Sequence, residues 1–351
     1  MKLETIRPLD KAAMAQAKAQ WDAVAKPLNS LGRFEQLVVQ MAGITGSAAV
    51  QAAPACVLVC CADNGVVAEG VSQSGQDVTR RVAQSIAAGE ANVNLMAQAA
   101  SADVFCVDMG MAERVQDARI LDCSPGHGTA NMTLGPAMTR AEAERAVTQG
   151  MALAADMRRR GYRIIATGEM GIGNTTTSAA VASALLGIAP ERIVGRGAGL
   201  SDSGLARKLS AVQRALAVNQ PRPDDALDVL HKVGGFDLAG LMGIFLGGAQ
   251  AHVPVIADGM ISCTAALLAE RLCPGTRDYV LPSHQSREPA GRLVLDALAL
   301  HPVLHGDMAL GEGTGAVMLL PLLDMALRVY HGAHTFRALE MAAYTPQEEK
   351  T

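Results

Sequence analysis

Short apolar runs alternate with longer helical stretches along most of this chain, and that alternation constrains its fold more than any other feature. Parallel strands need a crossover between neighbours, and a helix usually supplies it. The alternation therefore predicts an α/β fold, with a mostly parallel sheet flanked by helices. The five predicted strands are residues 55–61, 103–108, 162–167, 254–257 and 278–281.

The clearest predicted helix covers residues 140–160. Thr139 precedes it and Glu142 follows three residues later, which is the spacing of a capping box at a helix N-terminus. Apolar residues recur at helical spacing through the segment. Gly161 stands where helices commonly end, so the third strand is predicted to begin directly after it.

Helical sequence at both ends of the chain lies outside the alternation. We expect residues 1–44 and 323–351 to pack together as a small helical domain, with a turn at Gly32-Arg33. Residues 45–322 then form a large α/β catalytic domain. A length of 351 residues is compatible with one large domain or two modest ones.

Composition excludes several classes of protein. Half of the residues are hydrophobic and 18% are charged, so the chain can bury a sizeable core. A net charge of −4 with 3% aromatic residues argues against nucleic-acid binding. The longest weakly polar stretch, residues 238–257, is interrupted by Gln250, His252 and Pro254, so no membrane span is predicted.

The cellular compartment is predicted from the cysteines and the N-terminus. Seven cysteines form no CxxC pair, which argues against zinc binding or a disulfide scaffold. The first 25 residues are charged and lack the apolar region of a signal peptide. We therefore expect a cytoplasmic protein.

Polar loops follow all five predicted strands, and most of them contain glycine. Examples are Asp63-Asn64-Gly65 after the first strand, Asp258-Gly259 after the fourth and Ser283-His284 after the fifth. Ligands of open α/β folds bind outside the carboxyl ends of the strands. Any one loop could be a simple turn, but the five together predict a binding site.

The most informative loop reads GEMGIGNTTT, residues 168–177. Glycines let backbone N–H groups point into a concavity, and Asn174 or Thr175 can cap the following helix, whose N-terminus attracts an anion. The spacing nearly matches a P-loop, but Asn174 stands where the lysine belongs. We therefore predict a site for a single phosphate rather than for a nucleoside triphosphate.

A second loop, residues 195–199, reads GRGAG and precedes Lys208. No acidic residue stands at the position that a dinucleotide site requires, so a nicotinamide cofactor is not expected. Arg196 and Lys208 could complete a phosphate pocket. For Lys208, an exposed position on a helix is nearly as plausible.

The motif LGEGTG, residues 310–315, places one carboxylate between glycines and directly before an apolar run. A glutamate in such a turn is partly desolvated, which makes a carboxylate a stronger base. Glu312 is therefore a candidate general base, and Glu169 in its similar setting is expected to converge on the same pocket. The histidines form no metal-binding pattern: His301 and His305 lack the glutamate of HExxH, and His127 and His284 are loop residues that could contact a ligand.

Taken in order along the chain, these motifs resemble the nicotinate-nucleotide–dimethylbenzimidazole phosphoribosyltransferase family of cobalamin lower-ligand synthesis. Each motif is modest alone, and their order over most of the chain makes the resemblance specific. The residues that carry it are 26–27 with 30–33, 62–63 with 65–66, 69–72, 128–131, 135–138, 168–176, 233–237, 283–284 and 310–315.

The resemblance implies a homodimer whose large domain is Rossmann-like and whose small helical domain is built from both termini. It implies transfer of 5-phosphoribose from nicotinate mononucleotide to 5,6-dimethylbenzimidazole with inversion, giving α-ribazole 5′-phosphate and nicotinate, with no cofactor or metal. Glu312 would take the benzimidazole proton, with Glu169 beside it. The nucleotide would be held by Gly171, Gly173, Asn174, Thr175, Gly197 and Lys208, and the acceptor base by Ser74, Val82, Met170 and Leu310.

Four residues depart from the family pattern. Asn29 replaces a usual glycine, Asn64 a usual histidine, and Gly75 a frequent proline, while Val82 stands where some members have a glutamine. From Gly75 and Val82 we hypothesise an altered acceptor pocket, with adenine, another benzimidazole or a phenolic as possible acceptors. Two further alternatives stay open: a nucleotide phosphotransferase built on the near-P-loop, and a non-catalytic nucleotide-binding sensor.

Overall fold

The computed structural model describes residues 3–345 and contains one six-stranded sheet in which every pair of neighbouring strands is parallel. The strand order is β3-β2-β1-β4-β5-β6. The predicted α/β class with a mostly parallel sheet is confirmed. The strands are β1 (Ala55–Ala62), β2 (Ala102–Gly110), β3 (Ile120–Asp122), β4 (Ile164–Met170), β5 (Val255–Ala257) and β6 (Val280–Pro282).

The sheet differs from the sequence prediction in two main details, and the other predicted strand boundaries shift by at most two residues. The edge strand β3 was not predicted, because its sequence Ile-Leu-Asp has only two apolar residues in a polar segment. The strand β4 continues to Met170, three residues past the predicted end, so Gly168 and Glu169 are strand residues rather than loop residues. Their register against Val59 and Cys60 of β1 extends the strand, and propensity could not foresee that pairing.

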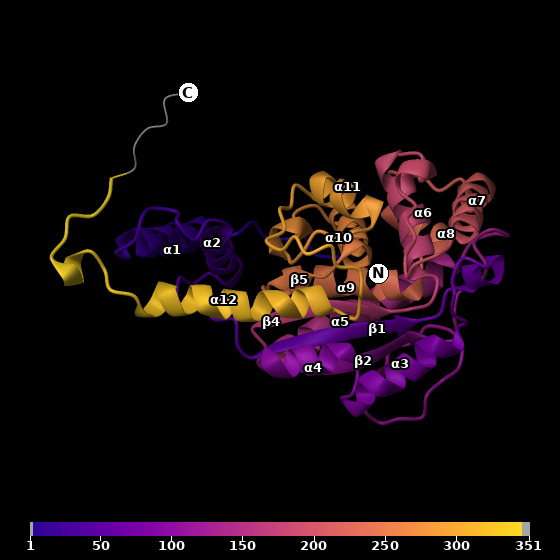
Figure 1. Cartoon of the computed structure of the whole chain (residues 1–351), viewed down its shortest axis with the longest axis horizontal. Coiled ribbons are helices and arrows are strands. Elements are labelled where there is room, and N and C mark those ends of the chain that lie inside the picture. The colour runs from indigo at the N-terminus through magenta and orange to yellow at the C-terminus, as the bar shows by residue number, and fades with distance from the viewer. Residues whose placement is uncertain (1–2, 346–351) are drawn as a thin grey trace.

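Helices cover both faces of the sheet (Figure 1). The strands contact α9 and α10 on one face, with α5, α6, α8 and α11 packed against these two helices, and they contact α3, α4 and α12 on the other face. The helices are α1 (Lys11–Ala23), α2 (Arg33–Thr45), α3 (Asp77–Ala88), α4 (Asn92–Ala99), α5 (Arg140–Arg159), α6 (Asn174–Leu186), α7 (Asp202–Asn219), α8 (Ala226–Val233), α9 (Phe236–Gln250), α10 (Met260–Leu272), α11 (Pro289–Leu298) and α12 (Thr314–Gly332).

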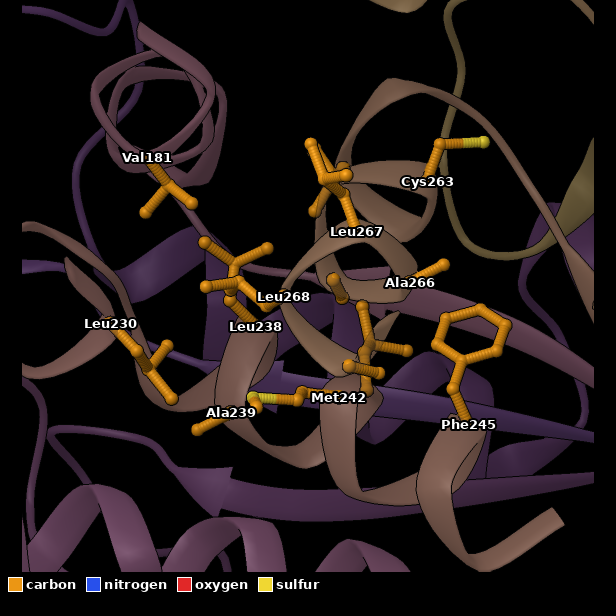
Figure 2. Close-up of a cluster of buried hydrophobic side chains, with 14 of the residues drawn as sticks. Val181, Leu230, Leu238, Ala239, Met242, Phe245, Cys263, Ala266, Leu267 and Leu268 are labelled. Atoms are coloured by element: carbon orange, nitrogen blue, oxygen red, sulfur yellow. The ribbon is translucent and has the colours of Figure 1, made fainter. Parts of the chain in front are cut away.

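The helix α9 lies at the centre of the larger core, and its residues from Phe236 to Ala249 are all buried. Figure 2 shows Leu238, Met242 and Phe245 of α9 packed with side chains from its neighbours, such as Leu268 of α10. The weakly polar stretch of the sequence is therefore an internal helix. In the part of the chain that the structure describes, no helix is both long and apolar enough to span a bilayer.

The predicted capping box begins α5. The Thr139 hydroxyl accepts from the Glu142 N–H at 3.2 Å, and the Glu142 carboxylate accepts from the Thr139 N–H at 2.8 Å. Gly161 follows the helix with φ +96°, the left-handed conformation that helix ends often require. This predicted helix is confirmed at both ends.

The N-terminal helices pack against the C-terminal half of α12. The rings of Trp21 and Tyr330 lie 5.0 Å apart, and Val24 pairs with Thr335 in an antiparallel bridge. In Figure 1, α1 and α2 lie beside the far end of α12, away from the sheet. Asn29 adopts φ +56°, which glycine or asparagine tolerates, so the departure at this position fits the backbone. Residues 1–2 and 346–351, the ends of the predicted small domain, lie outside the described residues.

Candidate active site

A cavity of about 310 Å³ lies at the carboxyl ends of β4, β5 and β6. A smaller hollow of about 80 Å³ adjoins it and shares the wall formed by Gly171, Asn174 and Gly197. The strand order reverses between β1 and β4, which is where ligands of doubly wound sheets bind. A larger hollow of about 820 Å³ lies near the amino end of β1, but its lining includes none of the predicted site residues.

One end of the site is formed by the glycine loop, residues 171–175, which leads from β4 into α6. Gly173 is the N-cap, with φ +93°, and no side chain caps the helix. The prediction that Asn174 or Thr175 caps α6 was therefore wrong, because both lie inside the helix. The Asn174 and Thr176 N–H groups bond to the Gly171 and Gly173 carbonyl oxygens, so the first turn offers an anion the Thr175 N–H and the positive end of the helix dipole.

Lys208 lies directly behind this loop. Its ammonium donates to the Thr175 hydroxyl at 2.8 Å, and its side chain is fully buried in α7. The alternative of an exposed lysine was therefore wrong. Burial lowers the pKa of Lys208 to about 8, and the charge of Glu288 acts in the opposite direction. A buried ammonium without a hydrogen-bonded carboxylate favours an incoming anion.

The second loop completes this end of the site. The Gly197 N–H donates to the Glu288 carboxylate at 3.0 Å. This bond holds residues 195–199 close to the glycine loop. Arg196 also lines the smaller hollow, and its guanidinium is bonded to the Leu200 carbonyl and to Asp202.

Glu312 sits in a strained turn that lines the cavity. Gly311, Glu312 and Gly313 all have positive φ, at +87°, +60° and +88°. A non-glycine residue rarely adopts this conformation, and such strain is concentrated at functional sites. The turn brings the Glu312 backbone N–H to the Glu169 carbonyl oxygen at 3.1 Å, so the two glutamates lie next to each other as predicted.

The Glu312 carboxylate is held at the N-terminus of α4. It accepts from the Val93 N–H at 3.2 Å and from the Asn92 side chain at 3.4 Å. A helix N-terminus interacts favourably with negative charge. The carboxylate is fixed in orientation, lines the cavity and is 8% exposed.

Two further acids beside Glu312 are buried. Burial, together with the charges of Asp237, Asp258 and Glu312, raises the pKa of Glu169 well above its usual range. Burial likewise raises the pKa of Asp258 to about 7, although N–H groups at the start of α12 bond to its carboxylate. Burial lowers the pKa of the neighbouring His284 to about 4, so that imidazole is neutral at pH 7. A positively charged ligand would lower both raised pKa values, because it stabilises the ionised carboxylates.

Part of the cavity wall is apolar. It is formed by Val78 and Val82 of α3, Met170, Met260 and Leu310, with the Ser74 hydroxyl at its edge. Leu310 is exposed at the mouth of the cavity. A flat aromatic ring with few polar groups suits this surface.

The structure brings the predicted residues to one site. Eleven of the twelve line the two hollows, and the twelfth, Lys208, contacts Thr175 from behind. Four more residues line the cavity: Asp258, which sequence reasoning noted only as part of a strand-end loop, His284, which it named as a possible ligand contact, and Ser286 and Glu288, which it did not select. The first two follow predicted strands and carried that signal, whereas Glu288 lies six residues beyond β6 and carried none.

Side chains that could ligate a metal are dispersed along the described chain. Within residues 3–345, no group of three or more His, Cys, Asp and Glu side chains is arranged to hold a metal ion. His301 and His305 lie in an irregular exposed segment rather than on a helix. His284 lines the cavity, whereas the exposed His127 does not.

Known proteins share this sequence and fold. A family model described as "Phosphoribosyltransferase" matches residues 6–340. A relative from Acetivibrio thermocellus, named nicotinate-nucleotide–dimethylbenzimidazole phosphoribosyltransferase, is 42% identical over 345 residues, 98% of this chain and 98% of its own. An Escherichia coli relative of the same name is 39% identical over 330 residues, 94% of this chain and 92% of its own. The crystal structure of CobT from Thermus thermophilus matches with a TM-score of 0.90 and 42% identity, over 95% of this chain and 100% of that one.

Proposed function

The chain belongs to the phosphoribosyltransferase family of these relatives, and on that premise we propose that it transfers 5-phosphoribose from nicotinate mononucleotide to 5,6-dimethylbenzimidazole. The products are α-ribazole 5′-phosphate and nicotinate, and the reaction serves cobalamin nucleotide-loop assembly. The observation that carries this proposal is a cavity lined by an anion-binding loop backed by Lys208, by the Glu312 carboxylate and by an apolar surface.

The donor fits the cavity by its charges. Its phosphate binds to the glycine loop at the start of α6, with the Lys208 ammonium behind Thr175. Its pyridinium and ribose then lie toward Glu169 and Asp258. As the bond between the ribose anomeric carbon and the pyridinium nitrogen breaks, the electron pair returns to that nitrogen and positive charge grows on the sugar. Carboxylates fixed in a desolvated site stabilise that charge.

The acceptor ring lies against Val82, Met170 and Leu310 and attacks the anomeric carbon through one nitrogen lone pair. Attack on the face opposite the departing nicotinate inverts the β-configuration to α. The ring must then lose its N–H proton, and the Glu312 carboxylate accepts it. Nicotinate leaves neutral at nitrogen and needs no proton. Holding both substrates in one cavity supplies much of the remaining acceleration.

The alternatives are less well supported. A phosphotransferase needs a lysine at the position of Asn174, and a sensor does not need a strained glutamate between two glycines. The family match does not favour another acceptor base. Val82 does line the predicted acceptor wall, and Gly75 lies beside Ser74 at its edge, so acceptor preference remains the property to measure.

We also propose that the protein is a cytoplasmic homodimer, as the family resemblance implies. The proposed division places residues 1–44 and 323–351 in a small helical domain and residues 45–322 in the catalytic domain. Contacts such as Trp21 with Tyr330 support the first part of that division. Sedimentation at micromolar concentration tests the dimer directly.

A chromatographic assay tests the function. Nicotinate mononucleotide is incubated with the protein and with dimethylbenzimidazole, adenine and p-cresol together, without added metal. We expect nicotinate release and one product, α-ribazole 5′-phosphate. Release of nicotinate with adenine or p-cresol consumed would correct the acceptor, and binding of the nucleotide without any release would support a sensor.

A further inference from the structure

Asp237, the first acidic residue of α9, lies buried beneath the glycine loop. One of its carboxylate oxygens accepts from the Leu238 N–H at 2.8 Å, and the other accepts from the Asn64 side chain at 3.4 Å. The Asn174 side chain also lies close enough to stabilise the ionised form of Asp237 and to lower its pKa. Asp237 lines neither of the two hollows at the site, so it does not touch a bound ligand.

The Asn174 amide links two carboxylates, because it also donates to Glu169. Asn64, Asp237, Asn174 and Glu169 therefore form a continuous chain of alternating amides and carboxylates from the end of β1 to the end of β4. An amide N–H₂ group has two donors, so Asn174 can serve Glu169 with one and stabilise the neighbouring Asp237 carboxylate with the other. The side chain of Asn174 is thereby fixed at the first residue of α6, where the anion-binding N–H groups begin.

The backbone of the glycine loop also packs closely against Asp237. A Cβ added to Gly171 would come within 2.7 Å of an Asp237 carboxylate oxygen and 2.5 Å of the Ala62 carbonyl oxygen. The loop thus rests on Asp237 with no room between them. Movement of that carboxylate changes the position of the loop, because a packed interior offers no alternative space.

We propose that Asp237 is a positioning residue, which in its ionised form holds Asn174 and the glycine loop in the geometry that binds the donor phosphate. The proposal rests on the proposed function. A protonated Asp237 accepts fewer hydrogen bonds, so Asn174 loses its second partner and the loop loses its support.

The surroundings of Asp237 make its ionisation sensitive to pH. The other titratable groups whose charges interact with it are Glu169 on β4 and Cys60 on β1, and neither is a cation. Burial raises the pKa of Asp237 to about 6, while the bonds from Leu238, Asn64 and Asn174 oppose that shift. As the pH falls through about 6, Asp237 gains a proton and donor binding weakens.

Calorimetric titration of the whole protein with nicotinate mononucleotide, from pH 5 to pH 8, tests the proposal. We expect Asp237→Asn to raise the donor Kd about tenfold at pH 7.5, which is about 1.4 kcal/mol, and to leave the acceptor KM unchanged. Below pH 6 the donor Kd values of the wild-type protein and of Asp237→Asn should become equal. The donor phosphate also titrates near pH 6, but that titration is common to both proteins, so the difference between their profiles reports Asp237 alone.

Two more variants complete the experiment. Asp108→Asn removes another buried acid that caps a backbone turn away from the cavity, and we expect it to lower stability without changing the pH profile. Asn64→Ser removes a hydrogen-bond donor to Asp237, which raises the pKa of that carboxyl. In this variant, the acid-induced loss of donor binding should therefore occur at higher pH than in the wild-type protein. This second variant gives an answer even if Asp237→Asn does not fold.

The outcomes separate the two proposals. Wild-type protein that neither binds nor turns over nicotinate mononucleotide would overturn the proposed function. The role of Asp237 alone would be overturned if the wild-type protein binds the donor normally and Asp237→Asn shows the same dependence of donor Kd on pH. It would also be overturned if Asn64→Ser loses donor binding at the same pH as the wild-type protein.

Discussion

Replacing Lys208 by methionine should make the protein more stable and less able to bind its donor. Lys208 is fully buried, and burial lowers its pKa from 10.5 to about 8. That difference corresponds to about 3 kcal/mol of unfavourable free energy at pH 7, where the ammonium is charged in both the folded and unfolded states. Losing the bond to the Thr175 hydroxyl costs about 1 kcal/mol. Lys208→Met should therefore gain about 2 kcal/mol of unfolding free energy at pH 7.

The sign of this gain depends on pH. Between pH 8 and pH 10.5 the folded protein has released the Lys208 proton while the unfolded chain still holds it, so wild-type stability rises with pH over that window. The advantage of Lys208→Met should shrink across the same window and reverse near pH 10.5. Urea unfolding followed by circular dichroism at pH 7, 9 and 10.5 measures it.

Donor binding should change in the opposite direction. Lys208 lies behind Thr175 and not in the hollow, so Lys208→Met removes a positive charge near the phosphate rather than a direct contact, and we expect roughly a tenfold rise in the Kd for nicotinate mononucleotide, about 1.4 kcal/mol. In the wild-type protein, donor affinity should fall above pH 8 as Lys208 loses its proton. Lys18→Met, an exposed lysine on α1, is the matched control and should change neither property. A Lys208→Met protein that is less stable at pH 7 and binds donor normally would refute this reasoning.

Three further predictions concern the turn, the loop and a helix cap. Glu312→Gln should lower kcat roughly 10²- to 10⁴-fold while donor binding persists, since only the proton acceptor is lost; an active variant would remove Glu312 as the base. Gly171→Ala should raise the donor KM and lower the melting temperature, because the new Cβ meets the Ala62 carbonyl oxygen at 2.5 Å; unchanged kinetics would contradict that packing. Thr139→Ala should cost about 1 kcal/mol in urea unfolding and leave kcat/KM unchanged, because it removes only the α5 cap.

Several parts of the fold followed from local sequence. The capping box at Thr139 and the stop at Gly161 involve residues close in the chain, so their pattern fixed the ends of α5. Alternation of apolar runs and helices predicted the sheet for the same reason. The end of β4 did not follow, because strand pairing with β1 decides it and that partner lies about 100 residues away.

The candidate site likewise contains residues that local sequence identified and residues that only the structure identified. Glu312 and the glycine loop were found from their own neighbours in sequence, since glycines and an isolated acid form a local signal. Lys208 remained ambiguous until α7 was placed, because burial is a property of the packed helix and not of its residue type. Glu288 and Asp237 gave no local signal of their roles, and only the structure shows which loops they hold.

The sequence by itself determined the alternating α/β architecture, the family and two motifs that line the cavity, because each depends on periodicity or on residues within a few positions of one another. The tertiary structure alone decided which charges are desolvated and which acids meet. Glu169, Asp237, Asp258 and Glu312 come from four separate segments, and the electrostatics of a site depend on distance through space and on burial, neither of which a linear pattern contains.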